Sequence, residues 1–213
     1  MAINMRMSIL AVCTFSLLVA GCCTTRQSAQ PSPEAPGYAV TCVGVLPAEP
    51  AAHFDESMTP AEKKQLENGI STLNRLLREE FIGRADIRLV SASQYDSIME
   101  NAPAEALSRA RIVADRVSCN AVLETTLKTF KERVGGKYSA KDPAAVSFDY
   151  RLIAVPGGTV LCGGSYEEVQ QSVMENLFTF STATHRGFTW ISAEDLMREG
   201  VQARFGECSY LSK

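Results

Sequence analysis

Histidine and tryptophan are scarce in this sequence, and the motifs that mark many catalytic and metal sites are missing. The 213 residues include two histidines, His53 and His185, which lie far apart, and one tryptophan. No two cysteines have C-x₂-C spacing, so no zinc-binding pattern is present. No nucleophile elbow of the form G-x-S-x-G occurs, and Gly135-Gly136-Lys137 lacks the other residues of a phosphate-binding loop. The sequence therefore predicts no catalytic residue, no metal site and no cofactor.

Basic residues are too few for a nucleic-acid-binding surface. The chain has 21 Lys and Arg against 24 Asp and Glu, a net charge of −3. Loss of Met1–Gly21 would remove Arg6 and leave 20 basic against 24 acidic residues, or −4. Nucleic-acid-binding domains normally carry a basic face, so we expect no nucleic-acid partner.

The longest apolar run lies at the amino terminus. Ser8–Ala20 is apolar or small, follows Arg6, and is shorter than the roughly 20 residues of a membrane-spanning helix. The run ends in Val19-Ala20-Gly21-Cys22, which resembles the lipobox of bacterial lipoproteins. That resemblance implies cleavage after Gly21 and acylation of Cys22, with palmitate or a similar chain as the membrane anchor. The alternative is an ordinary cleaved signal peptide followed by a chance cysteine.

The residues after Cys22 predict a location and a tether. Cys23 stands where an Asp would retain an enteric lipoprotein in the inner membrane, so the resemblance favours the periplasmic face of the outer membrane. Thr24–Gly37 contains three prolines among Ser, Gln, Thr and Ala, a composition typical of flexible linkers. We expect residues 1–21 to be a signal peptide, 22–37 a lipidated tether and 38–213 a single folded domain.

Five cysteines would remain besides the lipidated one: Cys23, Cys42, Cys119, Cys162 and Cys208. The number is odd, so at least one thiol stays unpaired or pairs between molecules. The compartment permits disulfides, but the sequence does not determine which cysteines pair. Our favoured interpretation is that Cys42 and Cys162 are small buried strand residues.

Three consecutive strands are predicted within Cys119–Gln170. Ala145–Val155 alternates apolar with polar side chains, which is typical of a half-buried strand. Ala121–Val134 precedes it, and Thr159–Tyr166 follows after a Pro-Gly-Gly turn whose first glycine would take a positive φ. Asp149 and Arg151 lie on one face of the middle strand, and we expect them to form a solvated pair.

Capping motifs and apolar stripes predict three helices. Thr59 and Glu62 match a capping box around Pro60, and an apolar stripe follows at helical spacing. Pro103 is expected to open a second helix, with Asn120 ending it in the left-handed conformation, and Ser192 to cap a third. The first stripe consists of Leu66, Ile70, Leu73, Leu77 and Phe81.

The element order is therefore β-α-β-α-β-β-β-α, with early strands at Tyr38–Leu46 and Asp86–Ser91. The β-α-β beginning implies parallel neighbours, whereas the later strands add antiparallel ones. We predict an α/β domain with a mixed sheet of about five strands flanked by three helices. Leu73 and Phe148 lie in the middle of strongly periodic elements, so we expect both in the core.

The whole pattern resembles a known group of envelope lipoproteins. It combines a lipobox, a Pro-rich tether, Val43-Gly44-Val45-Leu46-Pro47, Glu132-Arg133-Val134-Gly135-Gly136 and Tyr166-Glu167-Glu168-Val169-Gln170. These features are similar to small lipoproteins of the TolB-amino-terminal-like fold, which includes CsgG and LpoB. The resemblance implies an α/β domain that binds other proteins.

The leading functional hypothesis is a non-enzymatic, lipid-anchored envelope protein whose domain binds a protein partner or further copies of itself. One alternative is a subunit of a CsgG-like secretion pore, which would require oligomerisation and membrane-inserting strands. Another is an envelope hydrolase whose site the sequence does not reveal.

The stretch Leu177–Trp190 is rich in aromatic residues but fits neither helical nor strand spacing. Its aromatics could be buried in the core, which is our favoured interpretation. They could instead form an exposed patch that contacts a partner. The candidate partner-binding residues are Phe178, Phe180, Phe188 and Trp190.

Overall fold

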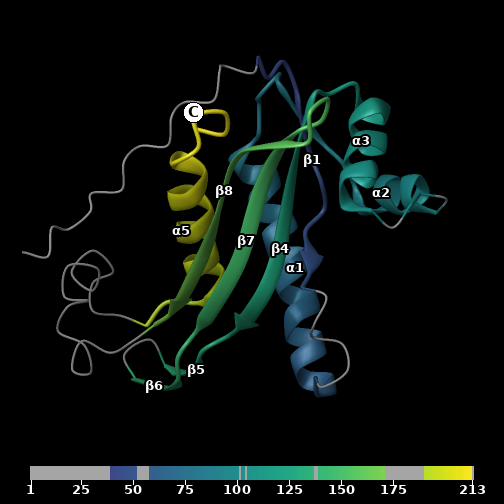
Figure 1. Ribbon diagram of the computed structural model, residues 1–213. Helices are drawn as coiled ribbons and strands as arrows, with labels where there is room; N and C mark the ends of the chain where they lie inside the picture. Colours follow the sequence, from purple (N-terminus) through teal and green to yellow (C-terminus); the bar gives the residue numbers. More distant parts are fainter. Residues whose placement is uncertain are drawn as a thin grey trace, which may run out of the picture. The chain divides into compact units, whose positions relative to one another are not determined.

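The computed structural model describes residues 39–51, 58–100, 102–103, 105–136, 139–170 and 190–212. All of the described residues belong to one compact unit, Tyr38–Lys213. This unit is a single α/β domain with a mixed sheet, as the sequence predicts (Figure 1).

The described part contains four helices and eight strands (Figure 1). The helices are α1 (Pro60–Glu80), α2 (Ala92–Met99), α3 (Ala106–Val117) and α5 (Ala193–Gly206). The strands are β1 (Val43–Val45), β2 (Glu49–Pro50), β3 (Ile87–Leu89), β4 (Ala121–Lys131), β5 (Val134–Gly136), β6 (Ser139–Asp142), β7 (Ala145–Ala154) and β8 (Thr159–Val169).

The main sheet has six strands and combines parallel with antiparallel pairing. Its order is β3-β1-β4-β7-β8, and β2 continues beside β4 after β1 ends. β1 pairs in parallel with both β3 and β4, whereas β4, β7 and β8 pair antiparallel. The parallel strands are joined by helical crossovers. A short turn joins the antiparallel strands β7 and β8, whereas the connection from β4 to β7 contains β5 and β6.

The two faces of this sheet are covered by different helices. α1 and α5 pack on one face, which we call the α1/α5 face, over side chains such as Leu123, Phe148 and Leu152. α2 and α3 pack on the opposite face, the α2/α3 face, over a smaller apolar cluster that includes Val122 and Val155. Leu73 and Phe148 are both 0% exposed, which confirms that they belong to the core.

Local signals place the helices α1 and α5 correctly. Thr59 Oγ1 accepts the backbone N–H of Glu62, whose carboxylate accepts the N–H of Thr59, so the predicted capping box is present. Ser192 and Asp195 form the same reciprocal box at the start of α5. The predicted stripe of α1 faces the core, and Ile70 packs against the core although it is only partly buried.

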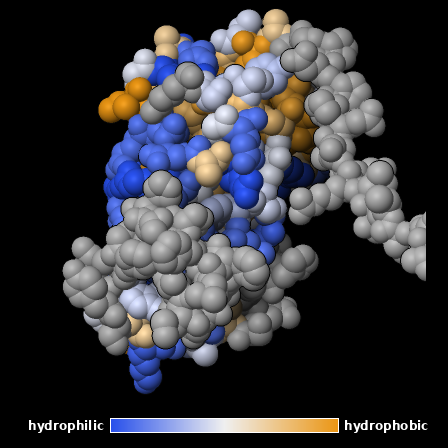
Figure 2. Space-filling view, turned by 90° about the vertical axis from the view of Figure 1, so that its left-hand side faces the viewer, coloured by the Kyte–Doolittle hydropathy of each residue, from blue (hydrophilic) through white to orange (hydrophobic). Residues whose placement is uncertain are grey.

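Charged side chains join α1 to α5 across their outer surfaces. Arg75 contacts Glu194 at 2.8 Å, and Arg198 contacts Glu79 at 2.6 Å. Hydrogen bonds from Arg198 and Arg75 hold the pKa of Glu79 below its usual value. Figure 2 shows the side of the domain on which α5 lies, and its described surface is mostly hydrophilic. Exposed pairs of this kind add little stability each, so the apolar stripes beneath them hold the helices.

Several predicted details are wrong. The structure adds β2 and the hairpin of β5 and β6, and the residues around Ser93–Asp96, for which the sequence favours a turn or a short helix, form the capped helix α2. The first strand is limited to Val43–Val45, and the second predicted helix begins at Ala106 rather than at Pro103. In the turn after β7, Gly158 and not the preceding glycine has the positive φ.

Asn120 does not take the left-handed conformation at the end of α3. Ser118 takes it instead, with φ 55°. The Asn120 side chain accepts the backbone N–H groups of Thr41 and Cys42, and its amide donates to the carbonyl of Ala39 at 2.8 Å. An asparagine that satisfies three backbone groups of the incoming chain secures the start of β1 beside β4.

Candidate functional site

Of the predicted partner-binding residues, only Trp190 lies within the described residues. Phe178, Phe180 and Phe188, like the predicted lipidation site Cys22, fall outside them. Trp190 is half-buried. It stands where the described chain resumes after Gln170, two residues before Ser192, the cap of α5.

The chain on either side of residues 171–189 is tied to the same place in the fold. The Gln170 side chain, whose residue is 7% exposed, accepts the backbone N–H of Ile191 at 2.9 Å. The described chain therefore leaves the end of β8 and resumes before α5 at two adjacent points.

Two further side chains hold the returning chain. Arg133 donates from Nη1 to the carbonyl oxygen of Trp190 at 2.8 Å. Glu132 accepts the backbone N–H of Ala193 with both carboxylate oxygens at 3.2 Å. Glu132 and Arg133 come from the connection between β4 and β5, and both belong to the motif that carries the family resemblance. The sequence did not predict that they anchor the aromatic stretch, because the contacts span about 60 positions of the chain.

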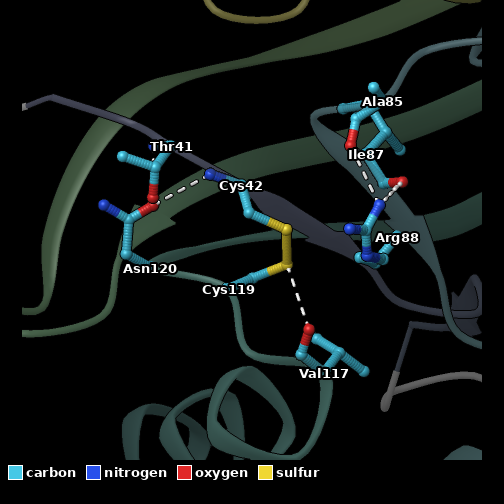
Figure 3. The surroundings of a disulfide bond; sticks show 8 residues. All are labelled: Thr41, Cys42, Ala85, Ile87, Arg88, Val117, Cys119 and Asn120. Carbon is cyan, nitrogen blue, oxygen red and sulfur yellow. Dashed lines mark hydrogen bonds between the residues drawn. A yellow bond between two sulfur atoms is a disulfide. The ribbon is translucent and has the colours of Figure 1, made fainter.

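Cys42 and Cys162, which the sequence favours as small buried strand residues, both form disulfides, and Cys42 is buried whereas Cys162 is only partly buried. Cys42 bonds to Cys119, and Cys162 bonds to Cys208. The first bond connects the start of β1 with the end of α3, next to the contacts of Asn120 (Figure 3). The second connects β8 with the turn after α5. Disulfides form and persist in oxidising compartments, which include the bacterial periplasm.

The polar half of the α2/α3 face carries ion pairs that differ from the expected one. Asp149 contacts Lys128 at 2.7 Å and accepts the hydroxyl of Ser165, whereas Arg151 pairs with Glu124. Asp149 and Arg151 therefore do not form the pair that we predicted. Burial alone would raise the pKa of Asp149, but hydrogen bonds from Lys128 and Ser165 lower it, and the net shift is downward.

Two specific features, a metal-binding cluster and a membrane-spanning helix, are absent from the described residues. Within this part of the chain, no group of three His, Cys, Asp or Glu side chains could hold a metal ion. Among the same residues, no helix is both long and apolar enough to cross a membrane. The two histidines, His53 and His185, lie outside the described residues.

The chain matches no protein-family model and no curated protein. Its fold is similar to several solved structures at low identity. PelC from Paraburkholderia phytofirmans, which is a dodecamer, shows 15% identity and a TM-score of 0.42, with 81% of this chain and 87% of that chain covered. The LpoB carboxyl-terminal domain from Salmonella enterica shows 17% identity and a TM-score of 0.36, with 64% of this chain and 88% of that chain covered. A lipoprotein from Neisseria meningitidis shows 15% identity and a TM-score of 0.36, with 69% of this chain and 98% of that chain covered.

LpoB is one of the proteins to which the sequence itself showed a resemblance, and likeness to CsgG and TolB stays a prediction.

Proposed function

We propose that this protein is a non-enzymatic lipoprotein of the bacterial cell envelope whose domain binds an envelope protein partner or another copy of itself. In this proposal Met1–Gly21 is removed, Cys22 carries the lipid, and residues 22–37 tether the domain at the periplasmic face of the outer membrane. The aromatic stretch Leu177–Trp190 is the docking element.

The observation that carries the proposal is the fixed anchorage on both sides of residues 171–189. Gln170, Glu132 and Arg133 hold the chain where it leaves and re-enters the domain. The stretch between contains Phe178, Phe180 and Phe188, and aromatic residues are enriched among the residues that dominate binding energy. A rigid base of this kind lowers the ordering cost of binding through the stretch.

The two disulfides support the location. Cys42–Cys119 and Cys162–Cys208 account for four of the five cysteines that remain in the proposed mature chain besides Cys22. Such bonds are rare in the reducing cytosol and common in the periplasm. Like the lipobox, these disulfides favour an exported protein.

Photocrosslinking in living cells tests the docking element. A photoreactive phenylalanine analogue at Phe178 or Phe188 should yield a discrete crosslinked species, because these side chains would face the partner. The same analogue at Ile82, which is 79% exposed on the domain itself, is the matched control. Equal crosslinking from Ile82 and from both aromatic positions would contradict the proposal.

Palmitate labelling tests the anchor. The Cys22→Ser variant should remain an unprocessed precursor without label, because the acyl acceptor sulfur is gone. Normal labelling of this variant would refute lipidation at Cys22.

Acrylamide quenching of Trp190, the single tryptophan, tests whether this end of the stretch takes part. Quenching that diminishes when the partner binds would support docking through Trp190. A blue-shifted tryptophan that stays unquenched in the isolated protein would remove Trp190 from the proposed interface.

A further inference from the structure

The connections that follow β1 and β3 leave the sheet in opposite directions. β1 and β3 are parallel neighbours. The chain after β1 forms α1 on one face, and the chain after β3 forms α2 and α3 on the other, beside the right-hand edge of the sheet in Figure 1. In open α/β sheets, such a divergence creates a crevice outside the carboxyl ends of the strands, where ligands bind.

A cavity occupies this position. Its volume is about 220 Å³. We call it the β1/β3 groove, and it is lined by Val45, Leu46, Pro47, Asn74, Leu77, Arg78, Leu89, Val90, Ser91 and Ala92. The volume lies below the roughly 300–1,000 Å³ that is typical of sites for drug-sized ligands. The groove therefore suits one small group rather than a cofactor.

Three groups of the groove lining can donate hydrogen bonds, namely the guanidinium of Arg78, the Nδ2 of Asn74 and the backbone N–H of Ala92. Arg78 is exposed, is the one charged side chain in the lining, and makes no ion pair or side-chain hydrogen bond within the described part of the chain. The Oδ1 of Asn74 already accepts the N–H of Ala48 at 2.9 Å, which leaves its Nδ2 to donate. The N–H of Ala92 opens α2 and precedes the first bond within that helix. A guanidinium with amide donors around it matches a carboxylate.

The rest of the lining is apolar. Leu77 and Val90 are buried, whereas Leu89 is 41% exposed at the edge strand β3. An apolar group in the groove would cover Leu89 and remove this surface from water. The preferred ligand therefore combines a carboxylate with an apolar group.

We propose that the β1/β3 groove binds the carboxyl end of a partner polypeptide whose last residue is apolar. The terminal carboxylate contacts Arg78, and the last side chain packs on Leu77 and Leu89. An internal Asp or Glu would bring polypeptide on both sides of its carboxylate into a space of about 220 Å³, whereas a chain end enters from one side. Capture of a terminal carboxylate is an established mode of peptide recognition. The proposal does not depend on docking through Leu177–Trp190.

Fluorescence polarisation with a defined probe tests this site in the mature, lipidated protein held in detergent micelles. The probe is a fluorescein-labelled peptide ending in Ser-Val-Leu with a free carboxylate, compared with the same peptide as its carboxyl amide. The free acid should bind on the order of tenfold more tightly than the amide, because a hydrogen bond to a charged group is lost in the amide.

Arg78→Gln should weaken binding of the acid by on the order of tenfold and abolish the difference between acid and amide. The matched control is Arg116→Gln, an exposed arginine near the end of α3 and outside the groove lining, which should bind both probes as the wild type does. Thermal unfolding of both variants should match the wild type, because both side chains are on the surface.

Equal binding of acid and amide would overturn the proposal, as would no saturable binding at about 1 mM probe. Binding of free 4-methylpentanoate without binding of the peptide would also overturn it, since the site would then take a small acid. Crosslinking at Phe178 or Phe188 measures a different surface, so failure of the groove and failure of the proposed docking element can be distinguished.

Discussion

The two faces of the sheet use the same strands for different purposes. On the α1/α5 face, alternate residues of β4 and β7 are large, apolar and buried, as Leu127, Phe148 and Leu152 show. On the α2/α3 face, only one end of the same strands is apolar, and the remainder carries Glu124, Arg151 and other paired charges. One face therefore supplies most of the buried apolar area, and the other combines a smaller core with polar surface.

Each face also has one disulfide. Cys162 and Cys208 join the α1/α5 core, where Cys208 is 2% exposed. Cys42 lies one residue before Val43, so its side chain points to the α2/α3 face, where it bonds to Cys119. The Cys162–Cys208 bond secures β8, which lies at the edge of the main sheet, whereas the Cys42–Cys119 bond lies at the start of β1, between β3 and β4.

The largest expected effect is on the α1/α5 face. Phe148→Ala should lower the free energy of unfolding by about 3–5 kcal/mol, because Phe148 is fully buried and packs against Tyr166 with ring centroids 5.5 Å apart. Urea unfolding monitored by circular dichroism measures the change. A loss below about 0.5 kcal/mol would mean that this face is not the main core.

Removal of the disulfide on the same face should have the next largest effect. Cys162→Ala with Cys208→Ala should lower the free energy of unfolding by about 2–4 kcal/mol, since the bond closes a loop of 46 residues. The pair Cys42→Ala and Cys119→Ala, with a separation of 77 residues, is the comparison on the other face. Unchanged stability after treatment of the wild type with a reductant would contradict this prediction.

Close helix–sheet contact on the α1/α5 face predicts a moderate effect at Gly69. A Cβ there would lie 2.5 Å from Cβ of Phe130, so Gly69→Ala should lower the free energy of unfolding by about 1–2 kcal/mol despite the better helix propensity of alanine. Gly206→Ala, near the end of α5, is the matched control, because nothing lies within 4 Å of its added methyl group. Thermal melts of both variants should separate them, and equal stability would show that α1 can move away from the sheet.

Loss of an ion pair on the α2/α3 face should cost less. Arg151→Gln should lower the free energy of unfolding by less than about 1 kcal/mol, because the Arg151 side chain is 56% exposed and pairs near solvent. Chemical denaturation measures this change in the free energy of unfolding. A loss of stability above about 2 kcal/mol would show that the Arg151–Glu124 pair is shielded from solvent.

The smallest expected effect is a pH dependence at Asp149. Its pKa is lowered in the folded protein, so its contribution to stability is present above the unfolded pKa and is lost as pH falls through the folded value. Its side chain is 36% exposed, so the effect should be a few tenths of a kcal/mol. Unfolding of the wild type and Asp149→Asn at about pH 5 and about pH 3 should show a steeper loss for the wild type. Parallel losses would contradict the role of Asp149.

Local patterns determined the elements that have strong internal periodicity or caps. The alternation of Ala145–Val155 predicted β7 to within one residue, and the capping boxes at Thr59 and Ser192 predicted where α1 and α5 begin. These features depend on residues at most four positions apart, so the sequence displays them directly. Short elements such as β2 and the β5–β6 hairpin carry too few residues for a period to be visible.

Only the tertiary structure decided which distant residues meet. Asp149 pairs with Lys128, which lies at the irregularity of the neighbouring strand β4, although Arg151 is nearer in sequence. Cys42 is bonded to Cys119 because the crossover through α2 and α3 returns the chain beside β1, and the β1/β3 groove exists because the two connections diverge. The choice of strand neighbours and their register is a property of the whole chain, and a linear pattern that records only nearby spacings does not contain it.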